Sequence, residues 1–291
     1  MKPSYGMDIK EGPVHPRVGV TGAQGFVGKH IVREFLSRHQ PVCCIVRNKG
    51  TATGLTPDVE TVEVGDLFAM KPAFLQRALR GIDVLVHAAW YAEPGFYLQS
   101  EKNLECLEGT LHLASVFARG GGKKFVGLGS CAEYAPSDQP LSTRSALKPE
   151  NLYGACKLSV FQILENYLPA RKVDFAWCRL FYLTGEGENE RRLIPYIRKQ
   201  LSLGEKVCLT EGKQVRDFMD VQSAAKQIVD IALGNICGAV NVCSGVPIMI
   251  RAMAERLADE YGRRDLLGFG ERPNNAFDPP YVVGVPHGGQ L

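Results

Sequence analysis

A glycine-rich stretch near the N-terminus constrains the fold more than any other part of this chain. Residues 18–28 read VGVTGAQGFVG, which places Gly22, Gly25 and Gly28 between an apolar strand-like run and an amphipathic helix-like run. Glycines at such a junction let the main chain come close to a pyrophosphate, and the N-terminus of the helix adds N–H groups and a partial positive charge. The stretch therefore predicts a dinucleotide-binding loop, with a merely tight turn as the alternative.

Strand-like and helix-like segments alternate along the chain, most regularly up to about residue 180. The strand candidates are residues 17–22, 41–47, 59–67, 81–89, 123–130, 173–181 and 239–245. The helix candidates are residues 28–39, 71–80, 101–119, 151–168, 192–203 and 221–233. This alternation predicts an α/β fold of the Rossmann type, a doubly wound parallel sheet with helices on both faces. The nearly continuous apolar strands agree, because strands of a parallel sheet are buried on both faces.

Beyond residue 180 the alternation weakens, and glycine, proline and charged residues become denser. We expect a smaller, discontinuous C-terminal lobe there, which would hold the substrate. The predicted organisation is a flexible N-terminal arm at 1–14, a nucleotide-binding domain at 15–181 plus about 217–248, and the second lobe at about 182–216 plus 249–291.

Composition argues against several functional classes. The net charge of the 291 residues is only +3 and the basic residues are scattered, which argues against a nucleic-acid partner. No apolar run approaches the roughly 18 residues of a membrane span, and the N-terminus lacks the apolar stretch of a signal peptide. The nine cysteines form no CxxC pair and have no histidine at zinc spacing, so we expect reduced core thiols, no metal and a cytoplasmic protein.

The end of the second strand predicts which dinucleotide binds. An acidic residue there would hydrogen-bond the ribose 2′-hydroxyl of NAD(H), but the strand ends with Ile45, Val46, Arg47 and Asn48. The Arg47 guanidinium suits a 2′-phosphate, so NADP(H) is favoured over NAD(H); the alternative is a solvated strand-end arginine. Asp66, after the third strand, is placed to meet the adenine amino group or to cap the next helix.

Residues 153–157 read YGACK and place a phenol and an ammonium one helical turn apart. Ser130 ends the strand at 123–130, and the carboxyl ends of parallel strands line the ligand crevice, so Ser130, Tyr153 and Lys157 are expected to meet there. Ketone reduction leaves negative charge on oxygen, which a proton from Tyr153 and a hydrogen bond from Ser130 would stabilise. We expect the Lys157 charge to lower the phenol pKa. The alternative is a core-boundary tyrosine beside a solvated lysine.

Six motifs occur in order along most of residues 17–281: TGAQGFVG at 21–28, GDL at 65–67, HAA at 87–89, GSCAEY at 129–134, YGACK at 153–157 and RDFMDV at 216–221. Together they make the chain resemble the extended short-chain dehydrogenase/reductases of the nucleotide-sugar epimerase, dehydratase and reductase kind. The resemblance implies a Rossmann domain with a small C-terminal substrate lobe and a catalytic set of Ser130, Tyr153 and Lys157. It also implies a homodimer through a bundle of the helices at 101–119 and 151–168.

The resemblance assigns further residues to the two ligands. The cofactor contacts that it implies are Gly22, Gln24, Gly25, Phe26, Val27, Gly28, Arg47, Asp66, Leu67, His87, Ala88, Ala89, Tyr153 and Lys157. The substrate contacts that it implies are Trp90, Tyr91, Ser130, Cys131, Tyr182, Arg216 and Arg272. His87 at the end of the fourth strand is expected beside the cofactor, with a general-base role as a less favoured alternative.

The implied substrate residues of the second lobe suggest a diphosphate. Arg216 in RDFMDV and Arg272 in GERPNN match phosphate-binding arginines of the family, with salt bridges as the alternative. Arg191 and Arg192 are further phosphate candidates, or solvated surface residues. Tyr182 stands where many members carry a substrate-binding asparagine, which suggests altered sugar contacts.

Two departures from the family bear on the reaction. The asparagine often found in the fourth helix is replaced by Cys106, and whether Asn103 one turn earlier substitutes for it stays open. Cys131 and Ala132 stand where dehydratases carry an Asp–Glu pair for elimination of water. Glu133 comes one position later, where strand geometry would turn it away, so a dehydratase is disfavoured.

The preferred interpretation is an NADPH-dependent reductase of a nucleotide-linked keto-sugar, by resemblance a 4-keto-6-deoxyhexose. A nucleotide-sugar 4-epimerase that retains NAD(P) uses the same catalytic residues and stays open, as does a non-enzymatic protein that senses NADP(H). Arg47 favours the reductase. Trp90 and Tyr91 also favour it if they prevent rotation of the sugar, but packing of the lobe interface explains them equally well.

Overall fold

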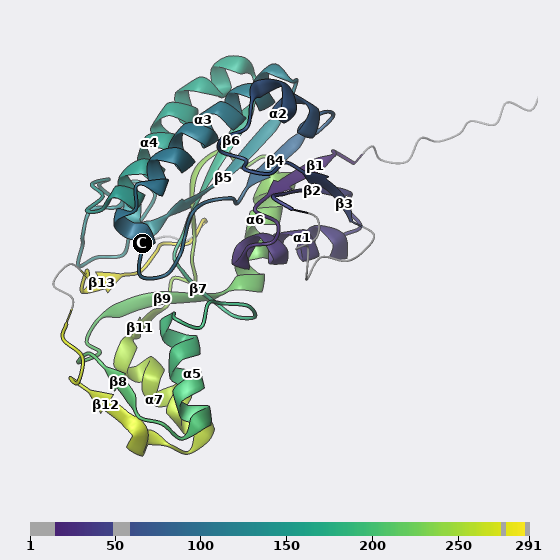
Figure 1. Ribbon diagram of the computed structural model, residues 1–291. Helices are drawn as coiled ribbons and strands as arrows, with labels where there is room; N and C mark the ends of the chain where they lie inside the picture. The colour runs from purple at the N-terminus through teal and green to yellow at the C-terminus, as the bar shows by residue number, and fades with distance from the viewer. Residues whose placement is uncertain (1–14, 49–58, 275–277, 289–291) are drawn as a thin grey trace, which may run out of the picture.

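The computed structural model describes residues 15–48, 59–274 and 278–288. The predicted N-terminal arm at 1–14 lies outside these ranges. Within them the chain forms a large α/β body and a smaller lobe beside it (Figure 1). Among the described residues, no helix combines the length and the apolar character that crossing a membrane requires.

A seven-stranded sheet forms the centre of the larger body, and each pair of neighbouring strands is parallel. In spatial order the strands are β10 (Gly238–Val242), β6 (Asp174–Leu180), β5 (Lys124–Ser130), β4 (Val84–His87), β1 (Val18–Thr21), β2 (Val42–Val46) and β3 (Glu60–Glu63). Each corresponds to a strand predicted from the sequence, and the order from β3 to β6 is that of a Rossmann fold. The predicted fold class is confirmed.

Helices cover both faces of this sheet (Figure 1). One face carries α1 (Phe26–Ser37) and α6 (Val221–Leu233), and the other carries α2 (Pro72–Ala78), α3 (Lys102–Arg119) and α4 (Leu152–Tyr167). Side chains along a strand point to alternate faces. In β4, Val84 and Val86 therefore join the apolar core under α1 and α6, whereas Leu85 joins the core under the other three helices.

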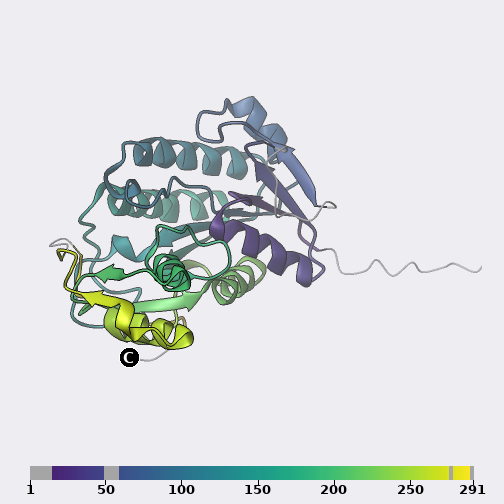
Figure 2. The same cartoon turned by 60° about the horizontal axis from the view of Figure 1, so that its bottom comes forward.

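The smaller lobe has its own sheet and its own core (Figures 1 and 2). Its central strand, β9 (Val215–Asp220), pairs with β7 (Tyr182–Thr184), β11 (Pro247–Met249) and β13 (Tyr281–Val282). A separate pair, β8 (Val207–Leu209) and β12 (Leu267–Phe269), packs with α5 (Leu193–Leu203) and α7 (Ile250–Tyr261). We propose two domains close to those given above, with the second boundary at the end of β9 in place of residue 217, because β9 belongs to the lobe's sheet up to Asp220 and α6, on the larger body, begins at Val221.

A buried carboxylate joins segments that are far apart in the sequence. Asp217 in β9 is fully buried, and its Oδ1 accepts hydrogen bonds from the Ser244 N–H at 2.8 Å and the Ser244 hydroxyl at 2.6 Å. Its Oδ2 accepts from the Gly245 N–H at 2.8 Å and the Gly284 N–H at 3.1 Å. One side chain thus holds the lobe's central strand, the turn after β10 and the C-terminal segment together.

Asp217→Ala should lower the free energy of unfolding by about 3 kcal/mol or more, because buried donors lose a charged acceptor. Urea midpoints measured by circular dichroism provide the test. The control is Asp220→Ala, which removes the side-chain cap of α6 at Gln222 and Ser223 and should cost about 1 kcal/mol. An Asp217→Ala midpoint equal to that of wild type would contradict the assigned role.

Candidate active site

A cleft of about 1560 Å³ opens at the carboxyl ends of the central strands, between the larger body and the smaller lobe. The loops after β1, β2, β4 and β5 line it, and Tyr182, Arg192 and Tyr281 line it from the lobe. Ligands of doubly wound folds bind at this edge of the sheet. The volume exceeds the roughly 300–1,000 Å³ of a typical small-molecule pocket. The cleft therefore has room for a dinucleotide and a second large ligand.

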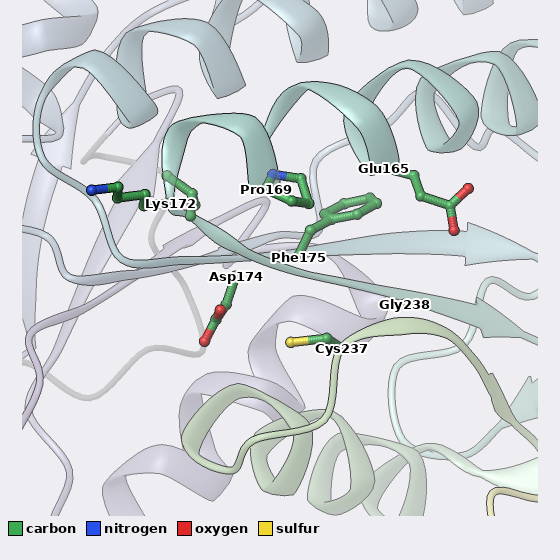
Figure 3. Close-up of a pocket in the computed structure, with 8 residues that line it drawn as sticks. Glu165, Pro169, Lys172, Asp174, Phe175, Cys237 and Gly238 are labelled. Atoms are coloured by element: carbon green, nitrogen blue, oxygen red, sulfur yellow. The ribbon is translucent and has the colours of Figure 1, made fainter.

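A smaller hollow of about 440 Å³ lies at the opposite edge of the sheet, where β6 and β10 begin. Its lining includes Glu165, Lys172, Asp174 and Cys237. In Figure 3 the charged ends of Glu165 and Lys172 point apart, and neither is directed at Cys237. Because these polar groups do not converge, the hollow is a weaker candidate than the cleft.

The glycine loop forms a close-fitting cradle at the start of α1. Gly22 has a φ of +66°, and a side chain there would meet the main chain of Ala89. A side chain at Gly28 would overlap the Gly22 carbonyl oxygen. Gly25 is the N-cap of α1, whose first turn has neither an acidic residue nor a side-chain cap in the described structure. The N–H groups of this turn can therefore bind an anion, which fits a dinucleotide pyrophosphate.

The predicted adenosine contacts line the same cleft. Arg47 is exposed at the end of β2, and Asp66 follows β3. The Asp66 carboxylate accepts a hydrogen bond from the Phe68 N–H at 3.1 Å, so it also shapes the turn after β3. Each residue predicted to contact the cofactor lines the cleft, with the exception of His87.

His87 lies beneath the cleft and contacts two threonines. Its Nδ1 is 2.8 Å from the Thr21 hydroxyl, and its Nε2 is 2.9 Å from the Thr110 hydroxyl. Burial lowers the pKa of His87 to about 3, and the Lys157 charge acts in the same direction. The imidazole is therefore neutral and links β4 to β1 and α3, which gives the alternative general-base role no geometric support.

Ser130, Tyr153 and Lys157 line the cleft together. Ser130 is the last residue of β5, and Tyr153 is the second residue of α4. The Asn151 side chain caps that helix by accepting from the Gly154 N–H at 2.9 Å. The strand end and the capped helix start thus bring the three side chains to one edge of the sheet.

The Tyr153 phenol is largely removed from water, although the residue lines the cleft and keeps some exposed surface. Burial raises the pKa of Tyr153 well above its ordinary value, the neighbouring Tyr97 adds to the rise, and hydrogen bonding with Ser130 opposes it. The expectation that Lys157 lowers this pKa is not met in the structure. The Lys157 amine lies 5.9 Å from the centre of the phenol ring, so desolvation dominates.

The Lys157 amine is almost fully enclosed, with the residue 4% exposed. Its Nζ donates to the Leu128 carbonyl at 2.7 Å and lies 3.6 Å from the centre of the Trp90 ring. Burial lowers the pKa of Lys157 to about 7, whereas Glu133 and Cys106 act to raise it. The charge of this amine therefore responds to small changes around it near neutral pH.

A hydrogen bond to Asn103 holds the Trp90 ring over the Lys157 amine. The indole Nε1 donates to the Asn103 Oδ1 at 2.9 Å. The Asn103 amide nitrogen donates in turn to the carbonyls of Tyr97 at 2.6 Å and Ser100 at 2.9 Å. Asn103 is thus committed to the loop after β4, which argues against its replacing the family asparagine. Cys106 accepts a weak bond from the Tyr91 N–H at 3.4 Å.

The predicted substrate residues divide into two groups. Trp90, Tyr91, Ser130, Cys131 and Tyr182 line the cleft, whereas Arg216 and Arg272 do not.

The arginines of the second lobe have partners within the protein. Arg216 is buried, donates to the Asp278 carboxylate at 2.6 Å and lies 5.4 Å from the centre of the Tyr182 ring. Arg272 is exposed, with its guanidinium 4.6 Å from the centre of the Tyr196 ring. Arg191 pairs with Glu93, and of these arginines Arg192 alone lines the cleft.

Some residues of the site were not found from the sequence. Tyr97 packs against Tyr153 with ring centres 4.8 Å apart, and nothing in its loop signals this. Asp278 lines the cleft and pairs with Arg216, from a segment without a motif. The role of Glu133 was missed although a signal existed, because Ser130 and Glu133 have the spacing of a capping box.

The fold and this cleft define a Rossmann-type protein built to bind a nicotinamide dinucleotide beside a Tyr–Lys pair. The sequence model of the NAD dependent epimerase/dehydratase family matches residues 18–243. The chain belongs to this family and is an enzyme of its nicotinamide-dependent kind.

Relatives and solved structures agree with this assignment. The chain is 24% identical over 268 residues to dTDP-6-deoxy-L-talose 4-dehydrogenase (NAD(+)) of Aggregatibacter actinomycetemcomitans, covering 91% of this chain and 98% of that protein. It is 27% identical over 257 residues to GDP-6-deoxy-D-mannose reductase of Pseudomonas aeruginosa, covering 84% and 79%.

Among solved structures, a dTDP-glucose 4,6-dehydratase of Streptomyces venezuelae with NAD bound superposes with a TM-score of 0.82 at 21% identity, covering 94% of this chain and 89% of that one. A UDP-glucose 4-epimerase of Thermus thermophilus in complex with NAD gives a TM-score of 0.82 at 21% identity, covering 94% and 93%. These structures share the fold.

Gly28→Ala should lose both thermal stability and cofactor affinity, because its methyl group overlaps the Gly22 carbonyl. Gly25→Ala should stay folded but bind a nicotinamide dinucleotide more weakly, because its methyl group, 3.2 Å from the Gly22 oxygen, crowds the glycine loop. Melting curves and fluorescence titration with NADH and with NADPH separate the two effects. A Gly28→Ala variant with wild-type melting and affinity would contradict the cradle.

Proposed function

We propose that this enzyme is an NADPH-dependent reductase of a nucleotide-linked keto-sugar, with a 4-keto-6-deoxyhexose as the substrate. The observation that carries the proposal is the meeting of Ser130, Tyr153 and Lys157 with the glycine cradle in one cleft. The two relatives named above are a dehydrogenase acting at position 4 of a deoxysugar nucleotide and a deoxysugar-nucleotide reductase. Oxidation at position 4, run in reverse, is reduction of a 4-keto group.

In this mechanism the bound nicotinamide supplies the hydride. The Tyr153 hydroxyl gives its proton to the carbonyl oxygen, and the Ser130 hydroxyl donates a hydrogen bond to the same oxygen. The raised pKa of Tyr153 leaves the phenol protonated at neutral pH, so the proton that reduction requires is present. The Lys157 ammonium lends positive charge as the phenol gives up its proton.

The residues after Ser130 argue against elimination of water. Cys131 and Ala132 offer no carboxyl group, and burial raises the pKa of the Cys131 thiol to about 12. We assign Trp90, Tyr91, Cys131 and Tyr182 to the sugar, since all four line the cleft.

We assign the diphosphate to Arg216 and Arg192. For Arg216 this requires the substrate to replace Asp278 as its partner. Arg272 faces Tyr196 outside the cleft and is the weaker candidate.

We also propose a cytoplasmic homodimer formed through α3 and α4. These helices pack side by side on the same face of the sheet (Figure 1). Each carries an exposed aliphatic side chain, Leu104 at 53% exposure and Ile163 at 47%, and a helix bundle across a two-fold axis would cover them.

The cofactor preference is tested at Arg47. Arg47→Ser should weaken NADPH binding by about tenfold or more and leave NADH binding unchanged, because a charged bond to the 2′-phosphate is lost. Arg77→Ser, which removes an exposed arginine of α2, is the control and should alter neither affinity. Equal losses for NADPH and NADH would contradict the proposed 2′-phosphate contact.

The reaction is tested with a panel of dTDP-, GDP- and UDP-linked 4-keto-6-deoxyhexoses and NADPH, followed at the nicotinamide absorbance band. We expect stoichiometric NADPH consumption, and a kcat lower by about 100-fold or more in Tyr153→Phe with NADPH affinity retained. Tyr167→Phe on the same helix, whose hydroxyl contacts Ser115 at 3.1 Å, should keep full activity. Interconversion of nucleotide hexoses without net NADPH consumption would instead favour a 4-epimerase.

A further inference from the structure

A buried carboxylate lies directly behind the catalytic edge of the sheet. Glu133 ends the short 3-10 helix η3 (Cys131–Glu133) that follows Ser130, and it is fully buried. Its Oε1 accepts from the Ser130 N–H at 2.8 Å and from the Trp177 indole at 2.9 Å. Its Oε2 accepts from the Arg179 Nε at 2.7 Å. Glu133 does not line the cleft, so it can affect the site only through the residues that it contacts, such as Ser130 and Trp177.

The sequence before Ser130 makes room for this cluster. Gly127 and Gly129 of β5 lie against the Trp177 ring, and a side chain at Gly129 would also overlap the Glu133 carboxylate. The Ser130 hydroxyl accepts from the Ala132 N–H at 3.1 Å, which completes a capping box with Glu133. The two glycines of the GLGS stretch thus leave the space in which the Glu133 carboxylate reaches the Ser130 N–H.

The bonding pattern defines the charge of Glu133. Burial raises the pKa of its carboxyl, and the Arg179 guanidinium and the other donors oppose that rise. Both carboxylate oxygens accept from N–H groups, which leaves a proton no favourable place. Arg179 is also fully buried, so the two opposite charges are held together out of water.

The same carboxylate and the lysine of the site lie near one aromatic ring, that of Trp177. The Lys157 Nζ lies 5.8 Å from the centre of the Trp177 ring, whose indole N–H is bonded to Glu133. The other titratable groups that act on Lys157 are Cys106 from α3 and His87 from β4. Burial keeps that thiol and that imidazole uncharged near neutrality. Tyr153, from the same helix as Lys157, is likewise an uncharged phenol.

We propose that Glu133 is a positioning residue, which fixes the main chain of Ser130 and, while paired with Arg179, also favours the charged state of the buried Lys157 amine. The proposal rests on the proposed function for the identity of the site, but its test needs only the cofactor. Without the Glu133 charge, the amine would lose its proton at a lower pH. Since the charged amine is expected to hold the anionic cofactor, affinity would then fall at a lower pH.

The test is the dissociation constant of NADPH from about pH 5.5 to about pH 9.5, measured by quenching of tryptophan emission in the full-length protein. We expect wild-type affinity to fall as pH rises through neutrality and Lys157→Met to lack this fall. In Glu133→Gln the fall should come about one pH unit lower. Glu165→Gln, an exposed carboxylate on α4, is the control and should match wild type, including any titration of the cofactor phosphate.

A second variant separates electrostatics from folding. Glu133→Leu combined with Arg179→Met replaces the buried ion pair by apolar side chains, which such sites often tolerate. We expect this double variant to fold and to show a downward shift smaller than that of Glu133→Gln, because the positive charge of Arg179 is removed together with the negative charge of Glu133. Wild-type profiles in either variant, or a wild-type affinity that does not vary near neutrality, would overturn the proposal. A downward shift together with failure of the keto-sugar panel would reject the reductase while leaving the role of Glu133 intact.

Discussion

The enclosed ammonium of Lys157 is the interaction on which the site depends. A lysine amine taken out of water loses much of its preference for the charged state, and here its pKa falls to about 7. Three features stabilise the protonated state of this amine: the Leu128 carbonyl at 2.7 Å, the face of the Trp90 ring at 3.6 Å and the negative charge of Glu133. Each comes from a different element, so the charge state of one amine reports on how β5, the loop after β4 and η3 are assembled.

The parallel sheet explains why these groups meet. Its strands all end at one edge, so the glycine cradle after β1, the Trp90 loop after β4 and Ser130 at the end of β5 share one cleft. Helix α4 returns to this edge with its capped first turn and presents Tyr153 and Lys157 one turn apart. The protonated phenol and the poised amine then act as a unit. Burial raises the pKa of Tyr153, which makes the phenol a weaker acid, so the positive charge of Lys157 is needed to help it release its proton to a carbonyl.

Much of this was predictable from the sequence, because local patterns determine it. Alternating apolar runs gave each strand of the central sheet, and the spacing of YGACK placed Tyr153 and Lys157 on one face of a helix. Contacts between segments far apart in the sequence were not predictable. Asp278 reaches Arg216 across 62 residues, and Asn103 orients Trp90 through a loop without regular structure. The direction of the Tyr153 pKa shift was predicted wrongly, because spacing reveals the neighbouring charge but not the loss of water around the phenol.

The central claim is that Lys157 is desolvated yet close to its protonation midpoint in the folded protein. The most direct measurement is a ¹³C NMR titration of lysine Cε resonances, with Lys157 assigned by its loss in Lys157→Arg. Burial also lowers the pKa of Lys124, so this assignment is essential. The account predicts that the Lys157 resonance titrates near pH 7, well below the ordinary lysine value of 10.5. A Lys157 resonance that titrates with the exposed lysines near the ordinary value would contradict it.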